Sequence, residues 1–258
     1  MGHRQQYNTS GRRRRRSPLG KLLTFAFICL VLFLGITAFF RVNEIEVSGD
    51  TRYSRSEVIE ASEIEFGSHL FLLRADTARA NILSRLPYAG HVEVLRQFPS
   101  RVEIIVTEAL PVAFLQTEGG YLLLDRSARI LERTEHRPIQ RLVELQGFET
   151  PILPREGEVL ALGEEGRAQL LYVQDILYLF SSLGLAPWIS ELDMTYVQSP
   201  QFIYDARFTV LLGPRRDVRH DMNMFIGILA ELDEDESGMI DLRPENPFFR
   251  QAEIEHNA

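Results

Sequence analysis

The stretch HVEVLRQFPSRVEIIVTE, residues 91–108, decides how the first folded part of this chain is built. Residues 98–100, Phe-Pro-Ser, form a turn signal in its centre. After the turn, apolar side chains occupy every second position, at Val102, Ile104 and Val106, which is the period of a half-buried strand. The half before the turn is also rich in apolar residues. The stretch therefore predicts two β-strands joined by a turn.

A strand and two short helices are expected upstream of these strands. Residues 42–49 alternate apolar and charged side chains and end in a glycine turn. Ser54 and Glu57 have the spacing of a capping box, which predicts the start of one helix. Asp76 is expected to cap a second helix, which Pro87 stops. The order strand, helix, helix, strand, strand predicts a small α+β unit with both helices on one face of the sheet.

One long uncharged apolar run, LLTFAFICLVLFLGITAFF at residues 22–40, lies before this unit. As a helix of 19 residues it would span roughly 28 Å, close to the thickness of the hydrocarbon core of a bilayer. Residues 1–21 carry six arginines, one lysine and no acidic residue. Because positive charge stays on the cytoplasmic side, the run predicts a membrane-spanning helix with a cytoplasmic, basic tail and an exported C-terminal part.

A cleaved signal peptide is the alternative, since it also joins a basic leader to an apolar run. The run is longer than the usual apolar core of about 7 to 15 residues. Residues 37–40, Thr-Ala-Phe-Phe, offer no small-x-small cleavage site. An uncleaved anchor is therefore the favoured interpretation.

The part of the chain after Arg41 is strongly acidic. It holds 20 arginines, no lysine and all 36 acidic residues, a formal charge of −16. Such a charge argues against nucleic acid and anionic lipid headgroups as partners. The single cysteine, Cys29, lies in the apolar run, so disulfides and the common cysteine-based zinc sites are excluded from the exported part.

Residues 111–250 predict a second region, made of short strands and two helices. The strands are expected at 112–116, 121–124, 130–133, 142–147, 189–196, 202–206, 208–212 and 239–243. The helices are expected at 164–183 and 217–232, where apolar residues recur at helical spacing. Residues 150–157, rich in proline and glycine, are expected to form a loop.

No pattern in the chain indicates catalysis, a metal or a cofactor. The six histidines are scattered, and no nucleophile-elbow, Walker or dinucleotide motif occurs. Residues 233–240 reproduce several positions of a calcium loop, but Pro244 stands where the bidentate glutamate is needed. This segment is therefore interpreted as an acidic, solvated turn, and we expect a protein that is not an enzyme.

Two segments carry a resemblance to a known family: VNEIEVSGDTRYSRSEVIEAS at 42–62 and LSRLPYAGHVEVLRQFPSRVEIIVTEALPVA at 83–113. They resemble the polypeptide-transport-associated (POTRA) module of the bacterial cell-division proteins FtsQ and DivIB. MIDLR at 239–243 is similar to the closing strand of that family. The resemblance implies an α+β chain: basic tail 1–21, transmembrane helix 22–40, βααββ POTRA domain 42–110, β-rich domain 111–250 with an antiparallel sheet and flanking helices, and C-terminal tail 251–258.

The resemblance also implies a partner-binding site in the last strand. FtsQ-like proteins bind two small bitopic partners, FtsL and FtsB or DivIC, largely through this strand and the helix before it. By motif, Arg243 would pair with an acidic partner side chain, and Ile240, Asp241 and Leu242 would belong to the same strand. Pro244 and Pro247 depart from the pattern, because they remove N–H donors where strand addition would continue. Either docking is shorter here, or Phe248 and Phe249 fill partner pockets instead.

The function implied is a non-enzymatic scaffold of the bacterial divisome, single-pass in the cell membrane, concentrated at the division septum and acting in septal wall synthesis. The alternative is a membrane-anchored chaperone or transport module, since the same α+β unit occurs in outer-membrane assembly and secretion proteins. An anchored wall enzyme is a third possibility, disfavoured by the missing catalytic set.

Overall fold

The computed structural model describes residues 18–148, 154–163 and 166–251 of the chain. Most of the basic tail 1–21, most of the C-terminal tail 251–258 and part of the expected loop 150–157 lie outside these residues.

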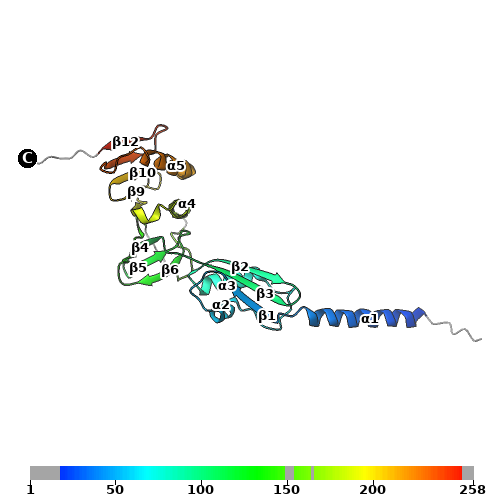
Figure 1. Cartoon of the computed structure of the whole chain (residues 1–258). Helices are drawn as coiled ribbons and strands as arrows, with labels where there is room; N and C mark the ends of the chain where they lie inside the picture. Colours follow the sequence, from blue (N-terminus) through cyan, green and yellow to red (C-terminus); the bar gives the residue numbers. More distant parts are fainter. Residues whose placement is uncertain (1–17, 149–153, 164–165, 252–258) are drawn as a thin grey trace, which may run out of the picture.

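Helix α1 (Pro18–Phe39) covers nearly all of the apolar run and projects from one end of the molecule (Figure 1). Its described apolar side chains are largely exposed, for example Leu22 at 65% and Phe25 at 66%. Taken over the described residues alone, no helix reaches the length and apolarity needed to cross a membrane. The helix predicted at 22–40 is thus confirmed, whereas its crossing of a membrane is not shown.

The small unit, residues 44–108, has the expected βααββ order. It consists of β1 (Glu44–Ser48), α2 (Arg55–Ser62), α3 (Ala75–Arg85), β2 (Ala89–Gln97) and β3 (Arg101–Glu108). The sheet order is β1-β3-β2, with β1 parallel and β2 antiparallel to the central β3. A core of its own holds the unit together, including Ile45, Val58, Ile82, Val92 and Ile104.

The two helix starts of the small unit differ from each other. The capping box at α2 is confirmed: the Ser54 hydroxyl accepts from the Glu57 N–H, and the Glu57 carboxylate accepts from the Ser54 N–H at 2.7 Å. At α3 the N-cap is Arg74 and not Asp76, which lies within the first turn. The expected cap was wrong by two residues, although a carboxylate in the first turn still favours the helix through its dipole.

The large unit, residues 113–251, is built on one nine-stranded sheet. Its strands are β4 (Ala113–Thr117), β5 (Gly120–Leu124), β6 (Ile130–Thr134), β7 (Val143–Gln146), β8 (Ile189–Asp193), β9 (Gln201–Tyr204), β10 (Phe208–Leu211), β11 (Gly238–Asp241) and β12 (Phe248–Gln251). Their order is β12-β11-β10-β9-β8-β7-β4-β5-β6. The expected antiparallel sheet is in fact mixed, because β4/β7, β7/β8 and β10/β11 are parallel pairs.

Helices α4 (Arg167–Ser182) and α5 (Val218–Leu229) pack on the sheet of the large unit (Figure 1). Short 3-10 turns precede β8 (η1, Ala186–Trp188) and α5 (η2, Arg215–Asp217). Aromatic side chains link helices and strands: Phe202 lies edge-on to Phe180 and to Phe225, with ring centroids 5.1 and 5.3 Å apart. All three are fully buried, so α4 and α5 are fixed to the middle of the sheet.

The two ends of the nine-stranded sheet differ. At the β6 end, the segment 154–159 runs along the outer side of the strand: the Gly157 N–H donates to the Ile130 carbonyl at 2.8 Å, and the Ile130 N–H donates to the Glu158 carbonyl at 2.9 Å. A further bridge joins Arg129 and Val159. The start of β6 is therefore covered by the chain itself.

A buried arginine joins the small and large units. Arg129 is 8% exposed, its guanidinium donates to the Ala89 carbonyl at the start of β2, and its Nε lies 3.5 Å from an oxygen of Asp125. Beside it, the Tyr88 hydroxyl donates to Glu132 at 2.6 Å. Burial and the bond to Glu132 raise the pKa of Tyr88 to about 12.

Replacing Arg129 by alanine tests this junction. We expect a loss of about 3 kcal/mol in the free energy of unfolding, because the substitution leaves the buried carboxylate of Asp125 without its cation. Urea unfolding of the full chain measures the change. The control Arg126→Ala, at an exposed position one residue after Asp125, should cost less than about 0.5 kcal/mol. Equal losses for both variants would contradict the role assigned to Arg129.

Candidate functional site

Strand β12 forms the other end of the nine-stranded sheet, and no strand in the described part of the chain pairs with its outer side. It pairs antiparallel with β11, with Met239 opposite Arg250 and Asp241 opposite Phe248. The expectation that residues 239–243 form the last strand was wrong, because a further strand follows them. The residues Ile240 and Asp241 therefore lie in an inner strand, with Leu242 and Arg243 directly after it.

The hydrogen bonds of β11 show which backbone groups of β12 point outward. The N–H groups of Gly238 and Leu242 donate to β10-side carbonyls, at 3.0 Å each. Alternation along the strand then directs Met239 and Asp241 toward β12. The backbone N–H and C=O groups of their partners Phe248 and Arg250 point back at β11. The backbone N–H and C=O groups of Phe249 and Gln251 are therefore on the outer side of β12. An edge of this kind can accept a strand from another chain.

Pro244 and Pro247 lie in the connection between β11 and β12. They do not end the sheet, since the chain turns through them and returns as β12. Both lie outside the residues that pair with β11. The missing N–H groups of these prolines therefore remove no hydrogen bond between β11 and β12 and no donor from the outer side of β12.

Asp241 and Arg243 form an ion pair at the end of β11. Two nitrogens of the Arg243 guanidinium donate to the two carboxylate oxygens of Asp241, at 2.8 and 2.6 Å, and the Arg243 N–H donates to the same carboxylate at 3.1 Å. Asp241 is 7% exposed. The bond from Arg243 holds the pKa of Asp241 below its usual range.

Arg243 is thus already engaged within the chain, although its side chain remains 46% exposed. Its third nitrogen lies 3.3 Å from the Ser199 hydroxyl. The guanidinium is held in one orientation by these contacts, with part of its surface open to solvent. The sequence could not indicate this internal partner, because nothing in the pattern says which way Asp241 points.

The two phenylalanines of β12 differ in exposure. Phe249 packs against the core of the large unit, and its ring centroid lies 6.0 Å from that of the buried Phe208. Phe248 is 42% exposed, and the Arg250 guanidinium lies 5.9 Å above its ring. Of the pair expected to fill partner pockets, only Phe248 presents a largely accessible ring.

The acidic turn at 233–236 belongs to the same end of the sheet. The Arg207 guanidinium donates to the carbonyl oxygens of Asp233, Glu234 and Glu236, at 3.5, 2.6 and 3.2 Å. Strand β11 follows directly, where a calcium-binding hand would need a helix. Over the described residues no cluster of three potential metal ligands is found.

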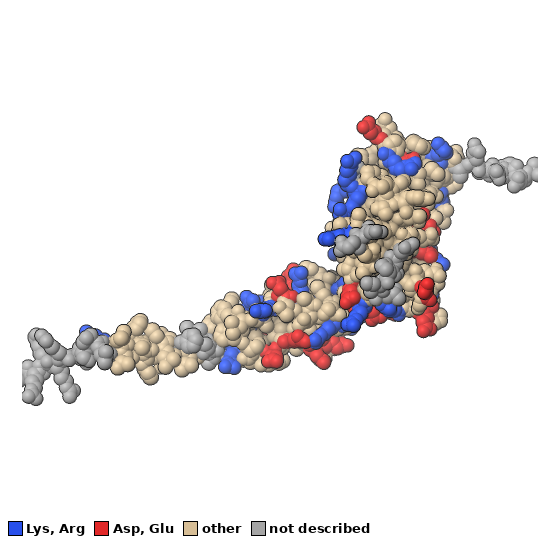
Figure 2. All heavy atoms as spheres, turned by 180° about the vertical axis from the view of Figure 1, so that it is seen from behind, with Lys and Arg blue, Asp and Glu red and all other residues tan. Residues whose placement is uncertain are grey.

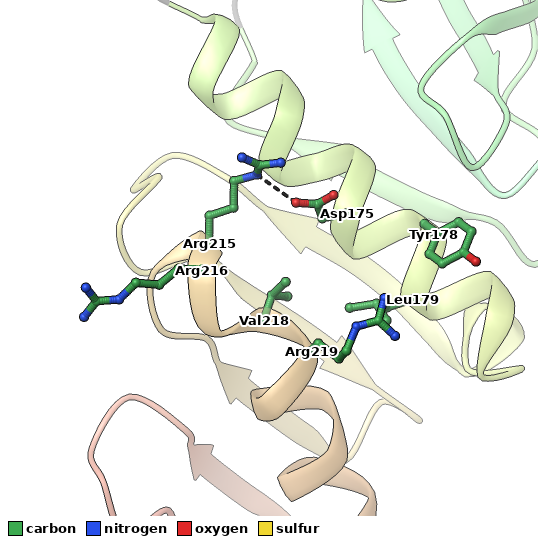
Figure 3. A pocket seen from close by; sticks show the side chains of 7 residues that line it. All are labelled: Asp175, Tyr178, Leu179, Arg215, Arg216, Val218 and Arg219. Atoms are coloured by element: carbon green, nitrogen blue, oxygen red, sulfur yellow. Dashed lines mark ion pairs between the residues drawn. The ribbon is translucent and has the colours of Figure 1, made fainter.

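A second feature is a hollow of about 550 Å³ between α4 and the start of α5 (Figure 3). Three arginines line it, Arg215, Arg216 and Arg219, and the Arg215 Nε lies 2.7 Å from a carboxylate oxygen of Asp175. Basic side chains gather on this flank of the large unit in Figure 2. The hollow could not be predicted from the sequence, since two separate helical segments form it. The clustering of three arginines within five residues was the available signal.

Comparison with known proteins first identifies the small unit. Residues 40–109 match the family described as "POTRA domain, FtsQ-type". The unit therefore belongs by both fold and sequence to the class of domain expected from the sequence.

Relatives extend the similarity over most of the chain. The cell division protein DivIB of Clostridium botulinum (strain Hall) is 23% identical over 241 residues, 92% of either chain. The cell division protein FtsQ of Chloroflexus aggregans is 28% identical over 88% of this chain and 79% of its own. FtsQ of Corynebacterium glutamicum is 35% identical over 40% of this chain and 47% of its own. These matches confirm the resemblance to the FtsQ/DivIB family of cell-division proteins.

Replacing Asp241 by asparagine tests the ion pair at the end of β11. We expect a loss of about 1 to 3 kcal/mol in unfolding free energy at pH 7, because a buried charge-assisted hydrogen bond is removed. The folded pKa of Asp241 is lowered, so its contribution is present above about pH 4 and is lost as the pH falls through the folded pKa.

The difference between the parent chain and Asp241→Asn should therefore shrink between about pH 4 and pH 2. Denaturant unfolding across this range measures it. Asp205→Asn is the matched control, because Asp205 pairs with Arg207 at 3.0 Å but is more exposed, at 36% of its side chain. A difference that stays constant with pH would argue against the assigned ion pair.

Proposed function

We propose that this chain is a non-enzymatic scaffold of the bacterial divisome that binds FtsL-like and FtsB/DivIC-like bitopic partners and helps control septal wall synthesis. The uncovered edge of β12 is the observation that carries the proposal. Relatives named as cell division proteins supply the biological setting. No enzymatic step is part of the proposal.

In this proposal the partner adds a strand to β12. The outward N–H and C=O groups of Phe249 and Gln251 supply the backbone hydrogen bonds, which are the main source of affinity in strand addition. The exposed ring of Phe248 offers an apolar contact beside them. Ile240 and Leu242, which are buried at 0% and 4% exposure, act by shaping the inner strand that supports β12.

Charge favours an acidic partner segment at this edge. Arg243 and Arg250 lie next to the edge strand and within it, and Arg250 also acts on Asp241 electrostatically. The exported part as a whole carries a formal charge of −16. A local basic site on an acidic chain would orient a partner carboxylate toward Arg243. The Arg243 guanidinium is held in one orientation by Asp241.

We further propose that α1 anchors the chain in the cell membrane, with the N-terminus cytoplasmic and the two folded units outside. The excess of arginine before the helix supports this orientation. The exposed apolar side chains of α1 support it as well, because no α1 side chain that the structure describes belongs to either hydrophobic core of the folded units. The septum is the expected site of action.

Replacing Gln251 by proline tests strand addition at β12. The substitution removes one outward N–H without touching the bonds to β11, so binding of an FtsB/DivIC-like partner should weaken about 3- to 10-fold. Calorimetric titration of the full chain with the partner measures the affinity. Gln251→Ala is the matched control, since it keeps the N–H and should bind normally. Equal affinity for both variants would exclude this edge as the docking strand.

Depletion of the protein in its host separates the two candidate functions. A divisome scaffold predicts filamentous cells with unsplit septa, because wall synthesis at the septum fails. A chaperone or transport module predicts normal division with a leaky envelope. Microscopy together with an envelope-permeability dye distinguishes them, and filaments rescued by the parent chain but not by Gln251→Pro would tie division to the β12 edge.

A further inference from the structure

Four phenylalanine rings converge at the end of the small unit that adjoins α1. Phe39 is the last residue of α1, and Phe40 follows it. Phe71 lies in the connection between α2 and α3, and Phe98 lies in the β2–β3 turn. Ring centroids of Phe40 lie 4.9 Å from Phe71 and 6.0 Å from Phe98, and those of Phe71 and Phe98 are 5.3 Å apart. We name Phe39, Phe40, Phe71 and Phe98 the aromatic end.

The aromatic end is largely open to solvent. Phe39, Phe71 and Phe98 are 61%, 51% and 61% exposed, and the neighbouring Leu72 is 79% exposed. These side chains belong to neither hydrophobic core of the folded units. A contiguous apolar surface of this kind marks a site of contact with a protein or a membrane.

The backbone holds this surface in place. The Val42 N–H donates to the Ser68 carbonyl at 2.9 Å, and the Leu70 N–H donates to the Phe40 carbonyl at 2.9 Å. The Asn43 N–H donates to the Ser100 carbonyl at 2.8 Å. These bonds tie both loops of the aromatic end to the residues that leave α1, so the rings are presented together and at a fixed place beside the helix.

Three arginines lie near the aromatic end, although the part of the chain after Arg41 is acidic as a whole. Arg41 is exposed and donates to the Gly67 carbonyl at 3.2 Å. Arg96 donates to the Leu73 carbonyl, and exposed Arg74 follows that residue in the chain. Glu63 and Glu65 are acidic residues of the same connection, and Glu63 is paired with Arg85. Glu44, beside the β2–β3 turn, is paired with Arg101 at 2.9 Å. Apolar rings with arginines at their border match the boundary between acyl chains and anionic headgroups.

We propose that the aromatic end inserts into the outer headgroup and acyl boundary of the bilayer that holds α1, and so docks the small unit on the lipid surface. Phe71, Leu72 and Phe98 enter the boundary, and Arg41, Arg74 and Arg96 contact phosphates. The inference rests on the anchoring of α1 proposed above. Helix α1 leads directly into the small unit (Figure 1), and its described apolar side chains are exposed, so the apolar surface of the aromatic end continues that of α1. This continuity and the neighbouring arginines favour lipid over a protein occupant.

Tryptophan reporters with brominated lipids test the insertion. The full chain, with its single tryptophan changed as Trp188→Phe, is placed in vesicles containing anionic lipid, and one reporter is introduced at a time. Phe98→Trp reports on the aromatic end, and Phe27→Trp reports on α1. Phe248→Trp is the matched control, because Phe248 is an exposed phenylalanine at the far edge of the large unit.

Lipid brominated near the headgroup should quench Phe98→Trp and leave Phe248→Trp unquenched, with Phe27→Trp quenched by deeply brominated lipid. Quenching at position 27 without quenching at position 98 would overturn the docking of the aromatic end while leaving the anchor intact. A blue-shifted but unquenched reporter at position 98 would also overturn it, since a protein would then cover the site. No quenching at position 27 would overturn the anchor and, with it, the docking.

The arginines provide a second measurement. Replacing Arg41, Arg74 and Arg96 together by glutamine should reduce quenching at position 98 in anionic vesicles to the level seen in zwitterionic vesicles. Quenching at position 27 should not change. Quenching at position 98 that is the same in both lipids and in both variants would contradict the contact of these arginines with headgroup phosphates.

Discussion

The arrangement of this molecule depends on the buried guanidinium of Arg129. It comes from the large unit, is neutralised by Asp125 of the same unit and donates to the Ala89 carbonyl of the small unit. The Tyr88 hydroxyl adds a second bond across the junction, because it donates to Glu132 of the large unit at 2.6 Å, and the Arg52 guanidinium of the small unit lies 3.5 Å above the Tyr88 ring. A buried charge tolerates little displacement from its partners, so the two units are held at one angle.

This junction matters because the candidate site lies at the opposite end of the large unit (Figure 1). Between the junction and β12 runs a single sheet, so each strand positions the next through backbone hydrogen bonds. The helices α4 and α5 add stiffness through the rings of Phe180, Phe202 and Phe225. The height of the β12 edge above the small unit is therefore a property of the fold and not of a flexible linker.

Features that depend on neighbouring residues could be predicted from the sequence. The capping box of Ser54 and Glu57, the strand alternation at Val102 and Ile104 and the helices of the large unit are local patterns. Features that depend on distant pairing could not. Strand β12 has only four residues and follows Pro247, so nothing local marks it as a strand, and it exists because β11 offers it an edge. The parallel pairs were missed for the same reason. The partner of Arg243 was missed although Asp241 is only two residues away, because the pattern does not say which way the Asp241 side chain points.

The segment 154–159 along β6 gives the nine-stranded sheet one occupied end and one open end. A sheet with two open ends can stack copy upon copy, which is the route from a folded protein to a fibre. Pairing of β12 with β12 of a second copy would be a closed two-fold arrangement that uses the same edge of both copies. With the start of β6 occupied by the segment 154–159, the described part of this sheet is poorly suited to stacking copy upon copy.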